Sequence, residues 1–142
     1  MHMATLVATR FSIVTTLPRT LIIARHLLQQ YGFEHHCAAL HAIDLPVLAL
    51  EDGSGLAQEK VRQRCIQSIR EDGCGAIVLG CGGMADLAQS LTRELGVPVI
   101  DGVTAAVKMV ESLVALGLNT SKHGDLDYPI RKNLSGQFER LN

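Results

Sequence analysis

The sequence predicts an α/β fold in which a parallel sheet carries helices on both faces. Three observations predict it. Short apolar runs alternate about four times with longer amphipathic segments along the 142 residues, and glycine follows most of those longer segments. Such alternation is typical of parallel sheets, because each crossover helix returns the chain to the end of the sheet at which the previous strand began. The third observation is the hydrophobic content of 47%, which is enough to fill one core.

Each element follows from its local pattern. The expected strands are short, apolar and rich in β-branched residues: 11–16, 37–43, 76–79 and 97–102. The expected helices carry apolar residues every three or four positions: 18–31, 57–71, 84–95 and 104–116. Pro18 fits the first turn of its helix, and Val61, Cys65 and Ile69 share one core-facing stripe. Residues 51–55 are expected to form a loop that could act as a lid.

The two ends of the chain differ from this regular middle. Residues 1–9 are apolar and compatible with a helix, but they lack an N-cap residue, so they resemble the last part of a helix. Residues 119–142 are polar and show no sustained period, which predicts an irregular tail. We therefore expect one α/β lobe at residues 10–118, between a terminal helix segment and the tail.

Composition argues against several classes of partner. The net charge is −1 and no basic block occurs, which disfavours nucleic acid and anionic membranes as partners. No apolar run reaches the roughly 18 residues of a membrane helix. The four cysteines form no C-x-x-C pair, so we expect reduced thiols in a cytoplasmic protein. His35, Cys37 and His41 would share a strand face, but no carboxylate completes a metal site, so we expect no metal there.

The central candidate for chemistry is Cys81. It follows the expected strand at 76–79 and precedes the expected helix at 84–95, with glycines on both sides. Glycines allow a sharp turn and a close approach of a ligand to the backbone. The start of a helix favours a thiolate, which is the reactive form of cysteine. The alternative is that Cys81 is simply a small core residue.

A nucleotide site is a second interpretation of the same stretch. Gly80, Gly82 and Ala85 fit the dinucleotide fingerprint, and Asp101 lies about 20 residues further on. Against it, the fingerprint normally follows the first strand of its unit, whereas this stretch follows the third expected strand.

Polar residues also follow the other expected strands. Thr15 and Thr16 end the first strand, and Asp101 ends the last one. Ligands of parallel sheets bind beyond the carboxyl ends of the strands, so we expect these residues to lie near Cys81. One threonine could instead serve only to cap the following helix.

The motifs together resemble the aspartate/glutamate/hydantoin racemase family, with hydantoin and allantoin racemases as the nearest likeness. The resemblance rests on FSIVTTLPR, AIVLGCGGMADL and GVPVIDGVTAAVKMVESLVALGLNTSK, and it extends over roughly residues 5–130. It implies two similar α/β lobes that face each other across a cleft, each with one cysteine. One cysteine removes the proton next to a carbonyl, and the other delivers a proton to the opposite face. The resemblance implies a small-molecule substrate and no cofactor.

By the same resemblance, Cys81 is the second of these cysteines. Thr15 and Thr16 would hold a carbonyl or amide of the substrate, and Gly82 and Gly83 would offer N–H groups. The first lobe and its cysteine have no counterpart in this sequence, so we expect a truncated form in which residues 1–9 end the inter-lobe helix. We expect the apolar surface that the first lobe would cover to favour self-association into a homo-oligomer. A dinucleotide-binding module, a single-cysteine decarboxylase and an inactive remnant remain as alternatives.

Overall fold

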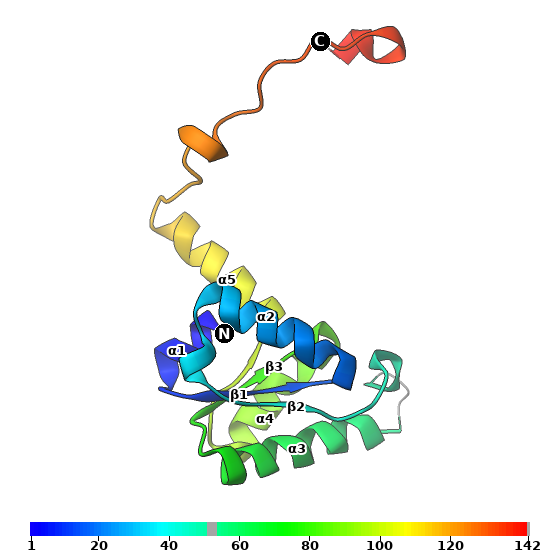
Figure 1. The fold of residues 1–142 in the computed structure, drawn as a ribbon, viewed down its shortest axis with the longest axis vertical. Coiled ribbons are helices and arrows are strands. Elements are labelled where there is room, and N and C mark those ends of the chain that lie inside the picture. The colour runs from blue at the N-terminus through cyan, green and yellow to red at the C-terminus, as the bar shows by residue number, and fades with distance from the viewer. Residues whose placement is uncertain (51–53, 142) are drawn as a thin grey trace. The chain divides into compact units, whose positions relative to one another are not determined.

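The computed structural model describes residues 1–50 and 54–141, and its four strands form one parallel sheet in the order β2-β1-β3-β4 (Figure 1). The strands are β1 (Phe11–Thr15), β2 (Cys37–Ala42), β3 (Ala76–Leu79) and β4 (Val99–Asp101). The α-helices are α1 (His2–Val7), α2 (Leu21–Tyr31), α3 (Leu56–Asp72), α4 (Ala88–Leu95) and α5 (Gly102–Ala115). The predicted fold class is confirmed. Most of the loop predicted at residues 51–55 lies outside the described residues.

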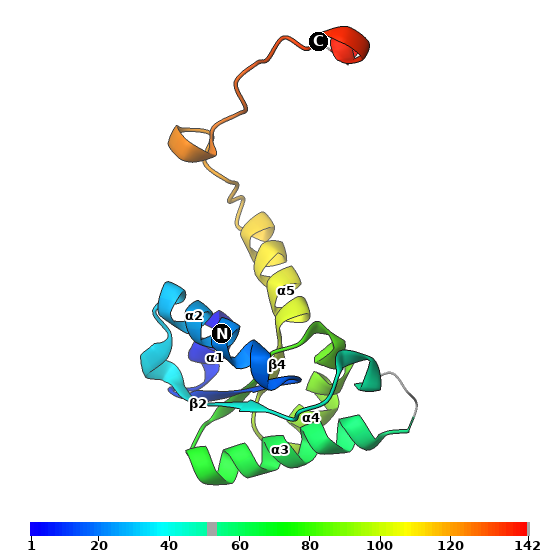
Figure 2. The same cartoon turned by 45° about the vertical axis from the view of Figure 1, so that its right-hand side comes forward.

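Helices cover both faces of the sheet, as Figure 2 shows for α2 on one side and α3 and α4 on the other. Side chains alternate along a strand, so Ile13 of β1 packs toward α2 and Val14 packs toward α3. The first face is filled by residues of α1, α2, β1 and β3, and the second by residues of α3, α4 and all four strands or their ends. The predicted core stripe of α3 is confirmed, since Val61 and Cys65 are fully buried.

The segment after Cys81 differs from the prediction. Instead of one helix from residue 84, a 3-10 helix (Gly82–Leu87) precedes α4, which begins only at Ala88. Tight 3-10 turns are frequent at the amino ends of α-helices, and the glycines at its start are poor α-helix formers. The fully buried Met84 anchors this turn in the core. A similar 3-10 turn, Pro18–Thr20, precedes α2.

The chain divides into two compact units, Met1–Met109 and Val110–Asn142, and α5 crosses the division. Within residues 116–141 the structure has only two 3-10 turns, Gly124–Leu126 and Gly136–Leu141, and otherwise irregular backbone. Across the described ranges, no helix has both the length and the apolar character that a membrane span requires.

A polar network ties α3 to the two strands above it. The Asp72 carboxylate accepts hydrogen bonds from Ser12 Oγ and from His41 Nε2, each at 2.7 Å. On the other side of the imidazole, Arg64 contacts His41 Nδ1. A guanidinium can only donate, so Nδ1 accepts and Nε2 carries the proton donated to Asp72. His41 lies on the edge strand β2, and its side chain is mostly buried because Arg64 and Asp72 of α3 are its two partners.

This network makes stability depend on pH. Burial alone would raise the pKa of Asp72, but hydrogen bonds from Ser12 and His41 outweigh it, and the pKa lies below its ordinary value. The stabilisation is therefore complete above the pKa of an unfolded aspartate, about 3.9, and is lost as the pH falls through the lower folded-state pKa.

We predict that Asp72→Asn lowers the free energy of unfolding at pH 7 by about 1–3 kcal/mol, because it removes charged hydrogen bonds in a buried setting. The difference from the unmodified chain should shrink as the pH falls below about 4. Urea unfolding at a series of pH values measures both. Glu71→Gln is the matched control, since Glu71 is the exposed neighbouring carboxylate. A difference that stays constant into acid would contradict the assignment.

Candidate active site

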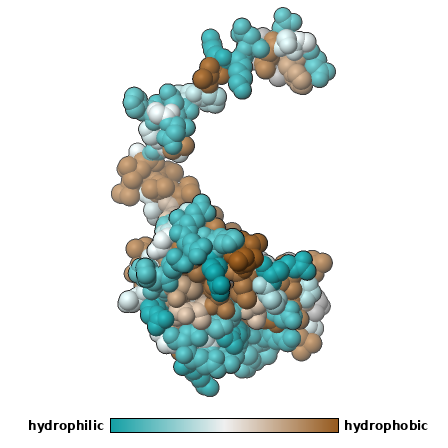
Figure 3. All heavy atoms as spheres, in the orientation of Figure 1, coloured by the Kyte–Doolittle hydropathy of each residue, from teal (hydrophilic) through white to brown (hydrophobic). Residues whose placement is uncertain are grey.

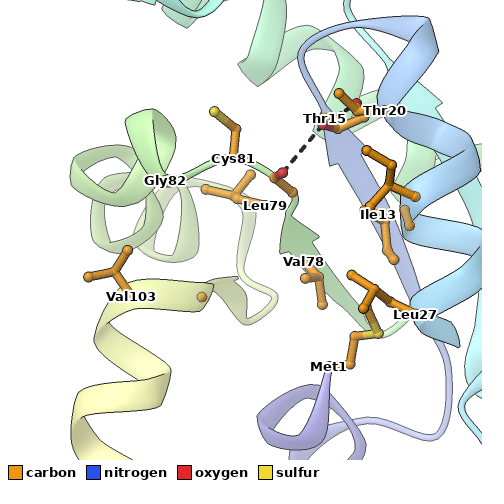
Figure 4. A pocket seen from close by; sticks show the side chains of 14 residues that line it. Met1, Ile13, Thr15, Thr20, Leu27, Val78, Leu79, Cys81, Gly82 and Val103 are labelled. Carbon is orange, nitrogen blue, oxygen red and sulfur yellow. Dashed lines mark hydrogen bonds between the residues drawn. The ribbon is translucent and has the colours of Figure 1, made fainter. Parts of the chain in front are cut away.

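A pocket of about 470 Å³ opens at the carboxyl ends of β1 and β3. Figure 4 shows Cys81, Thr15 and Thr20 in one part of it, with Met1, Leu27 and Val78 in another. The lining is mainly aliphatic, and its residues are Met1, Ile13, Thr15, Thr20, Ile23, Ala24, Leu27, Val78, Leu79, Gly80, Cys81, Gly82, Gly102 and Val103. Among the described residues of this lining, Cys81 is the one cysteine, and Thr15 and Thr20 contribute the hydroxyl side chains.

Cys81 occupies the junction between β3 and the 3-10 helix. Its backbone is extended, with φ −142° and ψ 134°, and it forms the N-cap of Gly82–Leu87. The prediction placed it before an α-helix; the structure gives it a shorter 3-10 helix, whose first N–H groups belong to Gly82 and Gly83. The first N–H groups of a helix have no acceptor within it, so they are available to a ligand or to solvent.

The junction is held by a close contact between Gly80 and Thr15. A Cβ atom on Gly80 would lie 2.9 Å from Thr15 Cβ, closer than real Cβ atoms come to other atoms, and 3.3 Å from Ile13 Cγ2, which is a tight contact. The Gly80 N–H also donates to the carbonyl of Val14 at 2.8 Å. Thus Gly80 is glycine because β1 and β3 meet here, and this contact fixes where Cys81 leaves the sheet.

Thr20 lies beside Thr15 in the pocket and was not anticipated from the sequence. Their Oγ1 atoms are 3.0 Å apart, and Thr20 Oγ1 donates to the Leu17 carbonyl at 2.7 Å. The 3-10 turn that starts at Pro18 carries Thr20 back over the end of β1. The proline turn was the only signal in the sequence, and it gave no indication of which side chain would face the strand.

The other predicted residues are distributed around this pocket. Gly82 lines it, whereas Thr16 and Gly83 do not. Thr16 is buried, and its carbonyl accepts the Leu45 N–H at 3.3 Å. Neither Thr15 nor Thr16 caps α2 through its side chain, and the N-cap residue of that helix is Thr20.

Asp101 has a structural role in this arrangement. It is buried at the end of β4, and its Oδ1 accepts the Thr104 N–H at 2.7 Å, as an N-cap of α5. Gly80 is explained by packing against Thr15, and a 3-10 turn stands where a phosphate-binding α-helix would begin. These observations give Gly80 and Asp101 structural roles in place of nucleotide binding.

The remaining cysteines lie outside the pocket. Burial raises the pKa of Cys65 to about 12 and that of the half-buried Cys37 to about 11. Cys74 is a core residue whose thiol donates to the Ser68 carbonyl at 3.7 Å. Among the described residues, no group of three or more His, Cys, Asp or Glu side chains converges on a metal position.

Apolar side chains remain exposed around the pocket. Figure 3 shows hydrophobic surface over α2, where Ile22 and Ile23 are more than half exposed. Val103, at the start of α5, lines the pocket and is 54% exposed. The pocket is therefore an open, apolar concavity with a thiol and two hydroxyls in its wall.

Comparison with known proteins assigns the family. The model of the Asp/Glu/Hydantoin racemase family matches residues 1–110. The chain belongs to this family. It is 47% identical over 135 residues to a hydantoin racemase of Rhizobium meliloti, a match that covers 95% of this chain and 56% of that protein. A hydantoin racemase of Pseudomonas sp. (strain NS671) is 41% identical, with 99% and 56% covered.

A solved racemase structure shares the fold. The allantoin racemase from Klebsiella pneumoniae superposes with a TM-score of 0.88 at 84% sequence identity, covering 99% of this chain and 58% of that one. The four-stranded parallel sheet is thus a fold of this racemase family. The chain spans a little over half the length of the racemases it matches.

We predict that Gly80→Ala destabilises the protein by about 1–3 kcal/mol, since the added methyl group must displace Thr15 in a packed junction. Gly82→Ala is the matched control, because its Cβ would meet only Val103 Cγ2 at an ordinary 3.8 Å. Thermal and urea unfolding of the two variants measure the effect. Equal stabilities would show that the Gly80–Thr15 contact is not tight.

Proposed function

We propose that the pocket beside Cys81 binds an uncharged cyclic ureide of the hydantoin type, and that Cys81 transfers the proton on the carbon next to the ring carbonyl. The observation that carries this proposal is the character of the lining. Among the described residues of the pocket wall, no side chain is Asp, Glu, Lys, Arg or His. Family membership and the names of the hydantoin and allantoin racemases support the reaction type.

The lining favours a neutral ring over an amino acid. A free amino acid carries an ammonium and a carboxylate, and moving such charges into an apolar wall without partners is costly. A hydantoin carries only N–H and C=O groups, which hydroxyls and backbone amides can satisfy. The same argument disfavours the decarboxylase alternative, whose dicarboxylate substrate would need cationic groups.

The chemistry we assign to the site is general acid–base catalysis. A carbon acid beside a carbonyl is weak, so it needs a positioned base and donors for the negative charge that develops on the oxygen. Cys81, as thiolate, would be the base. The Gly82 N–H, at the first turn of the 3-10 helix, would be a donor for the oxygen, and Gly83 would support that turn.

Racemisation also needs a proton donor on the opposite face of the carbon. Cys37, Cys65 and Cys74 lie outside the pocket, and two of them are core residues. We therefore propose that this chain supplies one half of a two-base site. The second group would come from polypeptide equivalent to the part of the racemases that this chain does not match, or from a second copy.

We predict that the chain catalyses deuterium exchange at C5 of 5-methylhydantoin in D2O, and that Cys81→Ser reduces the catalysed rate by at least about 100-fold, the contribution typical of a general base. NMR measures the rate against a protein-free background. Cys37→Ser is the matched control, since Cys37 is also a half-buried thiol, and it should leave the rate unchanged. Full activity in Cys81→Ser would refute the assignment.

A measurement of racemisation distinguishes a half-site with one base from a complete site with two. A chain that exchanges the proton but retains the optical activity of one enantiomer has a single base. Racemisation that rises with protein concentration more steeply than linearly would indicate that a second copy supplies the other acid.

We predict further that aspartate shows no exchange above background under the same conditions, because the pocket wall has no charged partner for it. NMR of the α-proton of L-aspartate in D2O, with 5-methylhydantoin as the positive control, checks this. Exchange of aspartate at a rate equal to that of the hydantoin would contradict the assignment of an uncharged substrate.

A further inference from the structure

The hydroxyls of Thr15 and Thr20 form a short chain of hydrogen bonds that ends at the Leu17 carbonyl. That carbonyl determines which hydroxyl donates and which accepts. The Leu17 carbonyl can only accept, so the proton of Thr20 Oγ1 is committed to it at 2.7 Å. Thr20 has a single hydroxyl proton, so in the 3.0 Å contact between the two hydroxyls Thr15 donates and Thr20 accepts. The Gly80 carbonyl, 3.4 Å from Thr15 Oγ1, is an alternative acceptor for the same Thr15 proton. Both hydroxyl protons are thus directed to protein acceptors.

This direction decides what the pocket offers a ligand. A hydroxyl oxygen has two lone pairs, and Thr20 uses one of them for Thr15. The other remains, and Thr20 is half-buried in the pocket wall, whereas Thr15 is only 2% exposed. The hydroxyl pair therefore presents an acceptor, not a donor, to a molecule in the pocket.

We propose that Thr20 is a specificity-determining residue: its hydroxyl oxygen, fixed as an acceptor by Leu17 and Thr15, accepts a hydrogen bond from a ring N–H of the substrate. This inference rests on the proposed function, because it takes a cyclic ureide as the ligand. Carbonyl oxygens of such a ring would be held by backbone N–H groups, and the hydroxyl pair would hold the N–H side. The predicted role of Thr15 changes accordingly from a direct contact to a positioning residue for Thr20.

The physical consequence is selectivity for an unsubstituted ring nitrogen. A site that hydrogen-bonds an N–H group discriminates against analogues that lack it, because its own polar atom is then left unpaired. A methyl group on that nitrogen removes the donor, so the contribution of Thr20 should disappear for the methylated substrate.

The test compares three substrates: 5-methylhydantoin, its N1-methyl analogue and its N3-methyl analogue. The variants are Thr20→Val, which removes the hydroxyl at nearly constant shape, and Thr20→Ser, which restores it. Thr5→Val is the matched control, since Thr5 Oγ1 also donates to a carbonyl three residues earlier, that of His2, but lies outside the pocket. Exchange in D2O yields kcat and KM, and titrations followed by NMR yield dissociation constants.

Thr20→Val should lower kcat/KM for 5-methylhydantoin by about 10-fold, the size of one hydrogen bond to a partly buried partner. For one of the two N-methyl analogues the loss should be less than about 2-fold, since that analogue has no donor for Thr20. Thr20→Ser should restore most of the activity, and Thr5→Val should change none of the ratios.

Two results would overturn the inference. An equal loss for all three substrates would mean that Thr20 only supports the fold, and the proposed function would stand. An unmodified chain that neither binds nor exchanges 5-methylhydantoin would refute the proposed function, and this inference with it. If the chain binds 5-methylhydantoin but does not exchange its proton, dissociation constants replace kcat/KM in the comparison. The ratio of variant to unmodified chain for each of the three substrates then distinguishes a specificity role of Thr20 from a structural role.

Discussion

The approach of Gly80 to Thr15 is the contact on which the candidate site depends. β1 and β3 are the central strands of the sheet, and at their carboxyl ends the side chains of Thr15 and Ile13 lie so close to residue 80 that no Cβ fits there. This contact sets the point at which Cys81 leaves the sheet. It also sets the position of the Thr15 hydroxyl, and through it that of Thr20. A short-range packing constraint thereby brings together groups that lie more than 60 positions apart in the sequence.

The two faces of the sheet differ in the polar groups that they carry. Under α3, the carboxylate of Asp72 is enclosed by Ser12 and His41, and the imidazole is in turn bound by Arg64. Arg64 Nε is buried there without a hydrogen-bond partner among the described residues, so the network is only partly satisfied. Beside α2, the wall is aliphatic and open, and the few polar groups are hydroxyls, a thiol and backbone amides. The face under α3 therefore encloses charged groups, whereas the pocket wall beside α2 has no charged side chain among its described residues.

Four cysteines in one chain illustrate how environment decides reactivity. Cys65 and Cys74 are small core residues, and burial disfavours the thiolate of Cys65. Cys37 is half-buried on the edge strand, and its raised pKa keeps it protonated at neutral pH. Cys81 alone among them lines the pocket. In the proposed function, its position beyond a strand end distinguishes Cys81 from the other three thiols as the acid/base.

The sequence by itself determined the fold class, the strand positions and the core stripe of α3, because hydrophobic period and glycine stops are local properties. It also singled out Cys81 and its glycines, since the strand–turn junction is contained in one short stretch. The tertiary structure decided what depends on packing between distant segments. It replaced the first turn of the expected helix by a 3-10 turn around the buried Met84. It gave Asp101 a capping role and His41 a buried partner on α3. Above all, it brought Thr20 to the pocket, because only the docking of the proline turn onto the end of β1 determines which hydroxyl faces the strand and in which direction its hydrogen bonds run.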